Sequence, residues 1–255
     1  MPLRLAVSPD VPDMTRADLF LVEQGFAVSR NEAQAAIHAG LVTADGAVVA
    51  KPSQILAAGA AIQFVKPHPY VSRGALKLAA ALEHFALSPD GRTCLDIGAS
   101  TGGFTEILLN GGARRVYAVD VGHGQMNARL AREPRVVRKE GLNARELTQA
   151  HVPEPLDAIV ADVSFIGLKL VLPPAIALAA PGCWLVALVK PQFEIGRWAV
   201  GKGGIVRDAE AQAGAVSAMS AWLTGLDVWS VLGSIESPIA GGDGNREFLI
   251  AAQKS

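Results

Sequence analysis

The most constraining feature of the sequence is the stretch Cys94-Leu-Asp-Ile-Gly-Ala-Ser-Thr-Gly-Gly-Phe104. Its apolar start predicts a buried strand, and the glycines that follow predict a tight turn into a helix from Phe104 to Asn110. The next predicted strand, Arg115 to Asp120, ends in a carboxylate 24 residues after Asp96, the distance at which an α/β fold places an acid near ribose hydroxyls. The sequence therefore predicts an α/β domain with a nucleotide-like cofactor at this turn.

The spacing of the glycines differs from the dinucleotide-binding fingerprint, because no third glycine follows Gly102 and Gly103 at the expected step. Asp-x-Gly-x-x-x-Gly with a second acid after the next strand instead resembles the S-adenosylmethionine-dependent methyltransferases. An ordinary glycine turn in an unrelated α/β protein is the alternative. The resemblance implies S-adenosyl-L-methionine as cofactor, with contacts from Asp96, Gly98, Ser100, Thr101, Gly102, Gly103, Phe104, Asp120, Val121, Asn143 and Asp162.

Composition limits the partners of the chain and its compartment. The formal net charge is only -1, so no overall basic field marks a nucleic-acid partner, and any contact with RNA would rest on local groups. Cys94 and Cys183 lie within apolar runs, where a thiol is usually a small buried side chain and not half of a disulfide. Together with a start that lacks signal-peptide features, they predict a cytoplasmic protein.

One uncharged run, Leu170 to Val189, is 20 residues long and by length alone could span a bilayer. Two prolines and the pair Pro181-Gly182 divide it, which favours a helix of about ten residues and a buried strand from Cys183 to Val189. We therefore expect no stable membrane association.

Changes in composition divide the chain into four segments. We expect residues 1–13 to be a disordered lead-in, residues 14–65 a small α+β domain, residues 66–72 a stiff linker and residues 73–255 the α/β domain. A length of 255 residues is sufficient for one large domain and one small one.

The small domain is predicted to contain two helices and a hairpin. Apolar residues recur at helical spacing from Leu19 to Phe26, and Ser29 can cap a second helix from Arg30 to Ala39. Asp45-Gly46 predicts a hairpin turn, and Ala60 to Val65 a closing strand.

This arrangement resembles the S4-like RNA-binding domain, through Arg16-x-Asp18, Ser29-Arg30, Gly40, Leu41-Val42, Asp45-Gly46 and Lys51-Pro52. The resemblance implies contact with RNA phosphates through Arg16, Arg30 and Lys51. Its charge departs from that of a typical RNA binder, since residues 1–66 hold five Lys or Arg against six acids. A small dimerisation or docking module is the alternative.

The large domain shows alternating strands and helices, which supports an α/β class. Further helices are predicted from Arg73 to Phe85 and from Asp208 to Leu223. The remaining predicted strands are Val136-Val137, Asp157 to Ala161, Val228 to Leu232 and Phe248 to Ala252. The methyltransferase resemblance implies a Rossmann-like sheet of seven strands whose last hairpin is reversed.

Charged residues follow several of these strands, at the edge where functional groups gather in open α/β sheets. Asp120, Asp162 and Lys190 end the second, fourth and fifth strands, and Phe165 and Phe193 follow closely, which suggests a pocket lining. A lysine that directly follows a buried strand is partly desolvated, which suits it to act as a base. A purely structural Lys190–Asp162 salt bridge is the alternative.

The order Lys77, Asp162, Lys190, Glu247 resembles the catalytic set of the FtsJ-like ribose 2′-O-methyltransferases. With the small domain added, the chain resembles the TlyA (hemolysin A) family from about residue 15 to residue 252. The motifs that carry this resemblance are Ser72-Arg73-Gly74-Ala-Leu-Lys77-Leu, Asp96-Ile-Gly-Ala-Ser-Thr-Gly-Gly-Phe104, Asp162-Val-Ser-Phe-Ile166, Lys190-Pro-Gln-Phe-Glu194, Gly201-Lys-Gly-Gly-Ile-Val-Arg207-Asp208 and Gly244-Asn-Arg-Glu-Phe-Leu249.

The resemblance implies a role for each member of the set. Lys190 would be the central base, Asp162 and Glu247 would position it, and Lys77 would complete the charge balance. Methyl transfer from a sulfonium needs alignment and a base, and it needs no metal.

The resemblance also implies contacts outside this set. Asp120 would hold the cofactor ribose and Asn143 would lie near the adenine, while Phe104 could equally be a core residue. Arg73, Lys202 and Arg207 would contact RNA, the last two from a glycine-rich loop whose alternative role is merely that of a solvated loop.

The sequence thus predicts an enzyme that methylates the 2′-hydroxyl of a ribose, with cytidine in ribosomal RNA as the implied target and ribosomal RNA or subunits as partners. A membrane-active hemolysin is a second hypothesis. A ribosome-binding assembly factor with a vestigial cofactor site is a third.

Overall fold

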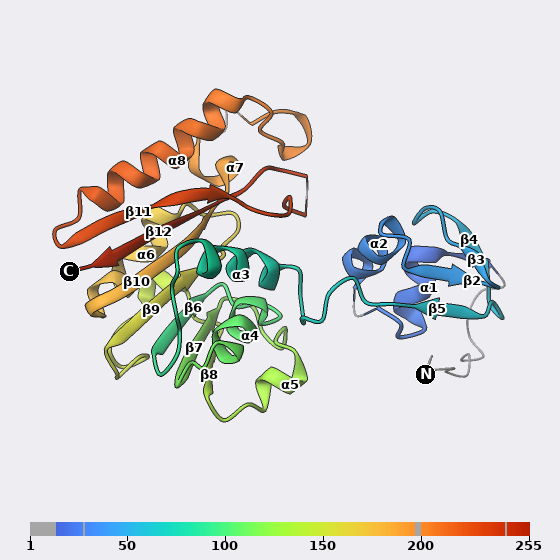
Figure 1. Cartoon of the computed structure of the whole chain (residues 1–255), viewed down its shortest axis with the longest axis horizontal. Helices are drawn as coiled ribbons and strands as arrows, with labels where there is room; N and C mark the ends of the chain where they lie inside the picture. Colours follow the sequence, from blue (N-terminus) through green and yellow to red (C-terminus); the bar gives the residue numbers. More distant parts are fainter. Residues whose placement is uncertain (1–13, 28, 197–199, 243) are drawn as a thin grey trace. The chain divides into compact units, whose positions relative to one another are not determined.

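The computed structural model describes residues 14–27, 29–196, 200–242 and 244–255 (Figure 1). The chain forms two compact units that divide between Pro69 and Tyr70, and each unit is described by itself. The predicted lead-in of residues 1–13 lies outside the described residues.

The first unit packs two helices against short antiparallel strands. Ser29 accepts a hydrogen bond from the Glu32 amide at 3.3 Å, which confirms the predicted helix cap, and Asp45 and Gly46 both have positive φ, as the predicted hairpin turn requires. The helices are α1 (Ala17–Glu23) and α2 (Arg30–His38), and one sheet has the order β3 (Ala47–Val48), β2 (Val42–Ala44), β5 (Ile62–Phe64). A second sheet of β1 (Met14–Arg16) and β4 (Ile55–Ala57) was not predicted, because three-residue strands carry almost no periodic signal.

The second unit is built on one sheet of seven strands in the order β11-β12-β10-β9-β6-β7-β8. Five neighbouring strands run parallel, and β12 runs antiparallel to both β10 and β11, so the predicted reversed hairpin is confirmed. The strands are β6 (Thr93–Ile97), β7 (Arg115–Asp120), β8 (Val136–Glu140), β9 (Leu156–Ala161), β10 (Ala179–Val189), β11 (Trp229–Glu236) and β12 (Phe248–Lys254).

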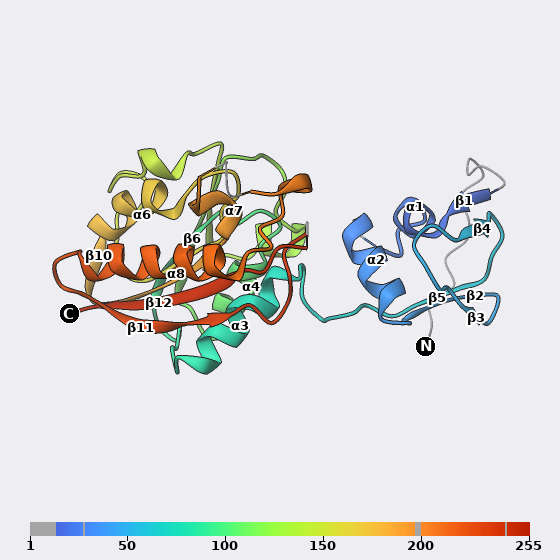
Figure 2. The same ribbon diagram turned by 90° about the horizontal axis from the view of Figure 1, so that it is seen from above.

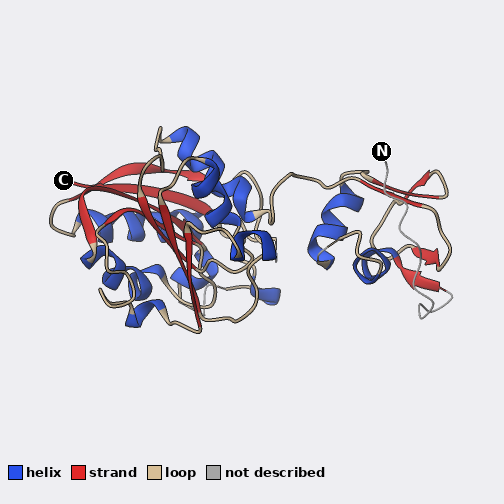
Figure 3. Cartoon of the chain, turned by 90° about the horizontal axis from the view of Figure 1, so that it is seen from below, coloured by secondary structure: helices blue, strands red, loops and turns tan. Residues whose placement is uncertain are grey.

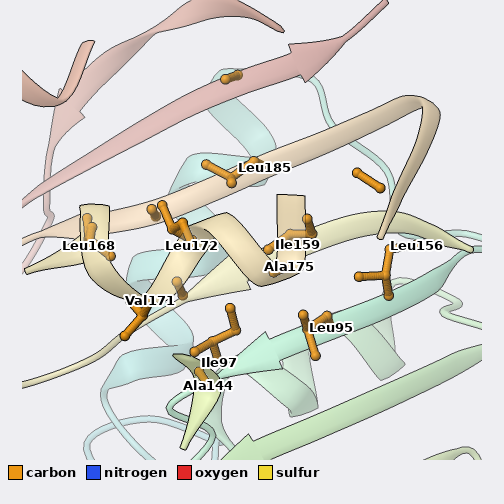
Figure 4. Packing of buried hydrophobic residues seen from close by; sticks show 14 of the residues in the cluster. Leu95, Ile97, Ala144, Leu156, Ile159, Leu168, Val171, Leu172, Ala175 and Leu185 are labelled. Atoms are coloured by element: carbon orange, nitrogen blue, oxygen red, sulfur yellow. The ribbon is translucent and has the colours of Figure 1, made fainter. Parts of the chain in front are cut away.

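Helices cover both faces of this sheet, as Figure 2 and Figure 3 show. On one face α3 (Gly74–His84), α4 (Gly103–Asn110) and α5 (Ala128–Ala131) bury Leu78, Leu108 and Leu130 against the strands. On the other face α6 (Leu168–Ala177) and α8 (Ala209–Thr224) pack on Leu95, Ile97 and Leu185, together with the single-turn helix η1 (Ala144–Glu146) (Figure 4). Because alternate residues of β6 face opposite layers, the strand is buried throughout.

The uncharged run of the sequence forms α6 and β10, with Pro173 and Pro174 inside the helix instead of at its end. The strand begins at Ala179, earlier than predicted, and its register with β9 shifts between Ala179 and Trp184, around the Pro181-Gly182 pair. No helix within the described part of the chain is both long and apolar enough to cross a membrane.

The glycine turn after β6 is fixed by a close approach of two strand ends. Gly98 has φ of +81°, and a Cβ at this position would lie 2.2 Å from the carbonyl oxygen of Asp162 at the end of β9. A backbone oxygen cannot move aside as a flexible side chain would, so residue 98 must be glycine.

We therefore expect Gly98→Ala to lower the free energy of unfolding by on the order of 3 kcal/mol, from strain at positive φ and overpacking. Urea unfolding of the full chain measures this effect. Gly214→Ala is the matched control, because Gly214 lies within α8 with no atom within 4 Å of the new Cβ; helix propensity should raise its stability by about 0.5 to 1 kcal/mol. Equal effects of the two substitutions would contradict the close approach.

Asp96 is fully buried on β6, and this burial raises the pKa of its carboxyl to about 7, although the Thr105 hydroxyl opposes the shift by donating to Oδ2 at 2.6 Å. Its ordinary value is 3.8, so between about pH 4 and 7 the folded protein holds a proton that the unfolded chain releases. The contribution of Asp96 to stability therefore falls as pH rises through this window, by on the order of a few kcal/mol.

Asp96→Asn should remove this dependence. We expect the difference in unfolding free energy between the wild type and Asp96→Asn to change steadily from pH 4 to 7 and to level off above pH 7, as measured by urea unfolding at each pH. A difference that is constant with pH would show that Asp96 titrates as an ordinary exposed acid does.

Candidate active site

The carboxyl ends of β6, β7, β9 and β10 meet at one edge of the sheet, because these strands run parallel in adjacent positions. The residues that follow them are Gly98, Val121, Asp162 and Lys190, and Asp120 is the last residue of β7. Most of the site residues predicted in the large domain therefore come from one edge.

The turn that follows β6 holds its own shape through backbone contacts. Gly98 donates to the Val119 carbonyl at 2.8 Å, and Gly102, with φ of +95°, caps α4 at its start. A Cβ on Gly102 would lie 2.4 Å from Leu130, and one on Gly103 would lie 2.2 Å from the Ser72 hydroxyl. The glycines are thus set by packing, while Ser100 at the tip of the turn stays exposed.

Asp120 fastens this turn to the loop after β7. Its carboxylate accepts hydrogen bonds from the backbone amides of Ser100 at 2.8 Å and Gly122 at 2.7 Å. The Asp120 side chain remains partly accessible, and the next residue, Val121, is 68% exposed. A fixed carboxylate with spare acceptor capacity is suited to bind the two hydroxyls of a ribose.

Asp96 supplies a second test of fit for S-adenosylmethionine. Thr105 bonds to its Oδ2, while its buried Oδ1 has no hydrogen-bond partner among the described residues. A buried acceptor without a donor is costly, and the cofactor carries both hydrogen-bond donors and a positive sulfonium. The acid at Asp96, the acid at Asp120 and the glycine backbone between them therefore fit the cofactor that the sequence implies.

Two further predicted cofactor residues, Phe104 and Asn143, have contacts within the protein. Phe104 is 4% exposed and packs in the core between α3, α4 and the sheet, as its alternative interpretation states. The Asn143 side chain accepts hydrogen bonds from the Arg145 amide and guanidinium at 3.1 and 3.2 Å and so caps η1. Adenine contact by Asn143 stays a prediction.

Lys77, Asp162, Lys190 and Glu247 form two ion pairs. Lys190 Nζ lies 2.6 Å from Asp162 Oδ1, and Lys77 Nζ lies 2.5 Å from Glu247 Oε2. Each lysine side chain is about 10% exposed, and the Glu247 side chain 3%. Few charges in proteins are buried to this degree without a partner, so the pairing explains how the fold tolerates them.

Two observations place the ion pairs next to each other. Val189 pairs with Phe248 across β10 and β12, so Lys190 and Glu247 directly follow and precede that pair. A Cβ on Gly74 would lie 3.9 Å from Asp162 Oδ2, and Gly74 is one helical turn before Lys77 on α3. The four side chains thus lie around the same edge of the sheet.

The two aromatic residues of these motifs also meet. The rings of Phe165 and Phe193 lie 5.2 Å apart, and Phe165 is 91% exposed with φ of +66°. An aromatic residue rarely adopts positive φ. Because no packing in the core explains this strained conformation at an exposed ring, it suggests that Phe165 has a functional role.

Two polar residues at this edge had no assigned role in the sequence interpretation. Ser164 accepts a hydrogen bond from Lys190 Nζ at 3.0 Å, and Asn245, only 1% exposed, bonds to the Val206 amide and the Gly204 carbonyl at 2.9 Å each. Asn245 thereby joins the glycine-rich loop to the loop that carries Glu247. Ser164 and Asn245 lie inside two of the motifs that carry the family resemblance, and this position is the sequence signal that could have identified them.

The predicted RNA contacts occupy varied positions. Arg73 is the half-buried residue before α3, Arg207 is exposed, and Lys202 begins the single-turn helix η3 (Lys202–Gly204). In the first unit, Arg16 and Arg30 both bind Asp18, and Lys51 is exposed in the turn that leads to β4.

Comparisons with known proteins agree with both units. The family model of the FtsJ-like methyltransferases matches residues 70–254, and that of the S4 domain matches residues 15–62. TlyA of Mycobacterium tuberculosis, a 16S/23S rRNA (cytidine-2′-O)-methyltransferase, is 45% identical over 92% of this chain and 88% of its own length.

Two further relatives carry a different description. Hemolysin A of Brachyspira hyodysenteriae is 37% identical over 92% of this chain and 98% of its own length. A solved structure from Streptococcus thermophilus, named provisionally as a hemolysin, superposes with a TM-score of 0.75 at 38% identity and covers 95% of this chain and 89% of its own. The chain thus belongs to the FtsJ-like methyltransferases and, within them, to the TlyA family of S-adenosylmethionine-dependent enzymes.

Proposed function

We propose that this enzyme transfers a methyl group from S-adenosylmethionine to the ribose 2′-hydroxyl of a cytidine in ribosomal RNA. The observation that carries the proposal is the two ion pairs, one buried and one partly buried, at the edge of the sheet that also holds the glycine turn. The S4 domain and the activity named for the Mycobacterium tuberculosis relative support ribosomal RNA as the substrate.

The cofactor, when bound, supplies a methyl group on a positively charged sulfur that leaves as a neutral thioether. The 2′-oxygen would take the methyl group as the carbon–sulfur bond breaks, and the hydroxyl proton would have to pass to a base. To act as that base, Lys190 would have to lose its own proton before the hydroxyl arrives, and it would become an ammonium beside Asp162 again when it accepts the substrate proton. General base catalysis of this kind contributes about 10² to 10⁴ in rate.

The remaining charged residues position Lys190. Asp162 and Ser164 hold its Nζ at 2.6 and 3.0 Å, which limits the directions from which a hydroxyl can approach. Glu247 lies beside Lys190 across the β10–β12 ladder and is neutralised by Lys77. With Lys190 neutral, the four side chains carry a net charge of -1, and they become neutral overall when the substrate proton moves to Lys190.

Neither alternative function is favoured by an observation on the described residues. A vestigial cofactor site would not need to keep two ion pairs intact. The hemolysin hypothesis rests on the names of relatives alone.

Lys190→Met keeps the length of the side chain and removes the base. We expect methyl transfer to fall at least about 100-fold, with cofactor affinity unchanged within a few-fold. Single-turnover transfer of labelled methyl to ribosomal subunits measures the rate, and calorimetry measures the affinity. Lys169→Met, at an exposed lysine of α6, is the matched control and should stay fully active. Wild-type activity in Lys190→Met would leave the Lys190–Asp162 pair with a structural role only.

We propose that the exposed ring of Phe165 stacks on an unpaired base of the substrate. We expect Phe165→Ala to raise the KM for ribosomal RNA on the order of 10-fold, since stacking of one base on an aromatic ring contributes about 1 to 3 kcal/mol. Leu170→Ala, also at an exposed apolar residue, is the control and should leave the KM for ribosomal RNA unchanged. An unchanged KM in Phe165→Ala would contradict the stacking role.

A further inference from the structure

The first unit holds a carboxylate whose surroundings are unusual for a small domain. Asp18 is 0% exposed, and four side-chain hydrogen bonds reach it. Arg16 donates from Nε at 3.0 Å and from a terminal nitrogen at 3.1 Å, Arg30 donates at 2.9 Å, and Gln34 donates at 2.9 Å. Residues from three places in the sequence are thus joined by one buried charge.

The charge on Asp18 is secured by these partners. Burial alone would raise the pKa of the Asp18 carboxyl, but the hydrogen bonds from Arg16, Arg30 and Gln34 outweigh it and hold that pKa well below its usual range. Asp18 is therefore ionised throughout the physiological range, and both guanidiniums stay attached to it.

The arginines are held but not buried. The Arg16 side chain is 44% exposed and the Arg30 side chain 53%. A guanidinium has five N–H donors, more than Asp18 takes from either arginine. Each arginine therefore keeps donors for a second anion while its orientation is fixed by the first.

The turn that contains a third basic residue, Lys51, is joined to the start of α1 by backbone hydrogen bonds. The Asp18 amide donates to the Pro52 carbonyl at 3.1 Å, and the Ala17 amide donates to the Gln54 carbonyl at 2.7 Å. These bonds hold the turn that contains exposed Lys51 against the start of α1. Arg16, Arg30 and Lys51 therefore come from adjoining segments of a unit whose sequence holds more acids than bases.

We propose that Asp18 is a positioning residue that holds Arg16 and Arg30 together as one preformed site for an RNA phosphodiester. The proposal rests on the proposed function, because it takes RNA as the partner of the first unit. Two arginines on a shared carboxylate lose little side-chain freedom when phosphate binds, and their forked donors match the phosphate oxygens. Asp18 thus improves the binding of an anion although it is itself an anion.

A substitution that removes the negative charge of Asp18 tests this role, because the two possible effects on RNA binding have opposite signs. Asp18→Asn raises the net charge of the protein by one, so attraction between charges alone predicts tighter binding to RNA. If Asp18 instead holds the two arginines in place for phosphate, releasing them should weaken RNA binding, on the order of 10-fold. Glu23→Gln is the matched control, since it makes the same change of charge on the exposed side of the same helix and should bind RNA as tightly as wild type or slightly more tightly.

The experiment measures binding of a ribosomal RNA transcript to the full chain by filter binding at several salt concentrations. A second pair of variants separates positioning from a loss of folding. If Asp18 acts through the arginines, adding Asp18→Asn to the Arg16→Ala/Arg30→Ala double variant should not weaken RNA binding further. A further loss in that background would mean that Asp18 acts by supporting the fold, and the proposal would be wrong.

The outcomes also separate this proposal from the proposed function. Wild-type protein that neither binds nor methylates ribosomal RNA would overturn the proposed function and this inference with it. Wild-type protein that binds and methylates, with Asp18→Asn binding as tightly as Glu23→Gln, would overturn the positioning role alone.

Discussion

The contact between the end of β6 and the end of β9 determines the rest of the active site. Gly98 approaches the Asp162 carbonyl so closely that no side chain fits between them. This contact brings the glycine turn, which fits the cofactor, beside Asp162, the first acid of the proposed catalytic set. Asp162 then holds Lys190 at the end of the neighbouring strand. The spacing between the glycine turn and Lys190 is thus set by the backbone of the sheet and not by flexible loops.

Buried charge is the second recurring element of the structure. Asp96, Glu247 and Asp18 are each almost completely buried. They differ in how many of their carboxylate oxygens have hydrogen-bond or ion-pair partners, and this difference indicates what each acid does. Asp18 binds two arginines and Glu247 binds Lys77, which fixes those cations in place. Asp96 keeps one oxygen without a partner among the described residues, at the turn where a cationic cofactor would bind. A buried acid that is fully paired acts on neighbouring side chains, and one that is only partly paired is suited to a ligand.

Much of the fold could be predicted because its signals are local. The glycine turn, the strand ends at Asp120, Ala161 and Val189, and the cap at Ser29 follow from patterns within about ten residues. The seven-stranded sheet with its reversed last hairpin required the family resemblance, since periodicity carries no information about which strands pair. The meeting of Phe165 with Phe193, and of Lys77 with Glu247 across 170 residues, depends on tertiary packing alone.

The sequence was least informative where one residue serves several segments. Asn245 and Asp18 are ordinary polar residues in the sequence, yet each bonds to backbone or side chains from two or more elements. Phe104 shows the reverse, because its place in a cofactor motif suggested a ligand contact while its burial is explained by the core. A motif defines which residues belong together, and the packing decides which of them are free to meet a ligand.

Mapping of ribose methylation on ribosomal RNA from cells with and without this gene tests the central claim most directly. The account predicts that a 2′-O-methylated cytidine disappears when the gene is deleted and returns with the wild-type gene but not with a Lys190→Met copy. An identical methylation pattern in all four strains would contradict both the proposed reaction and the role given to the paired lysines and acids.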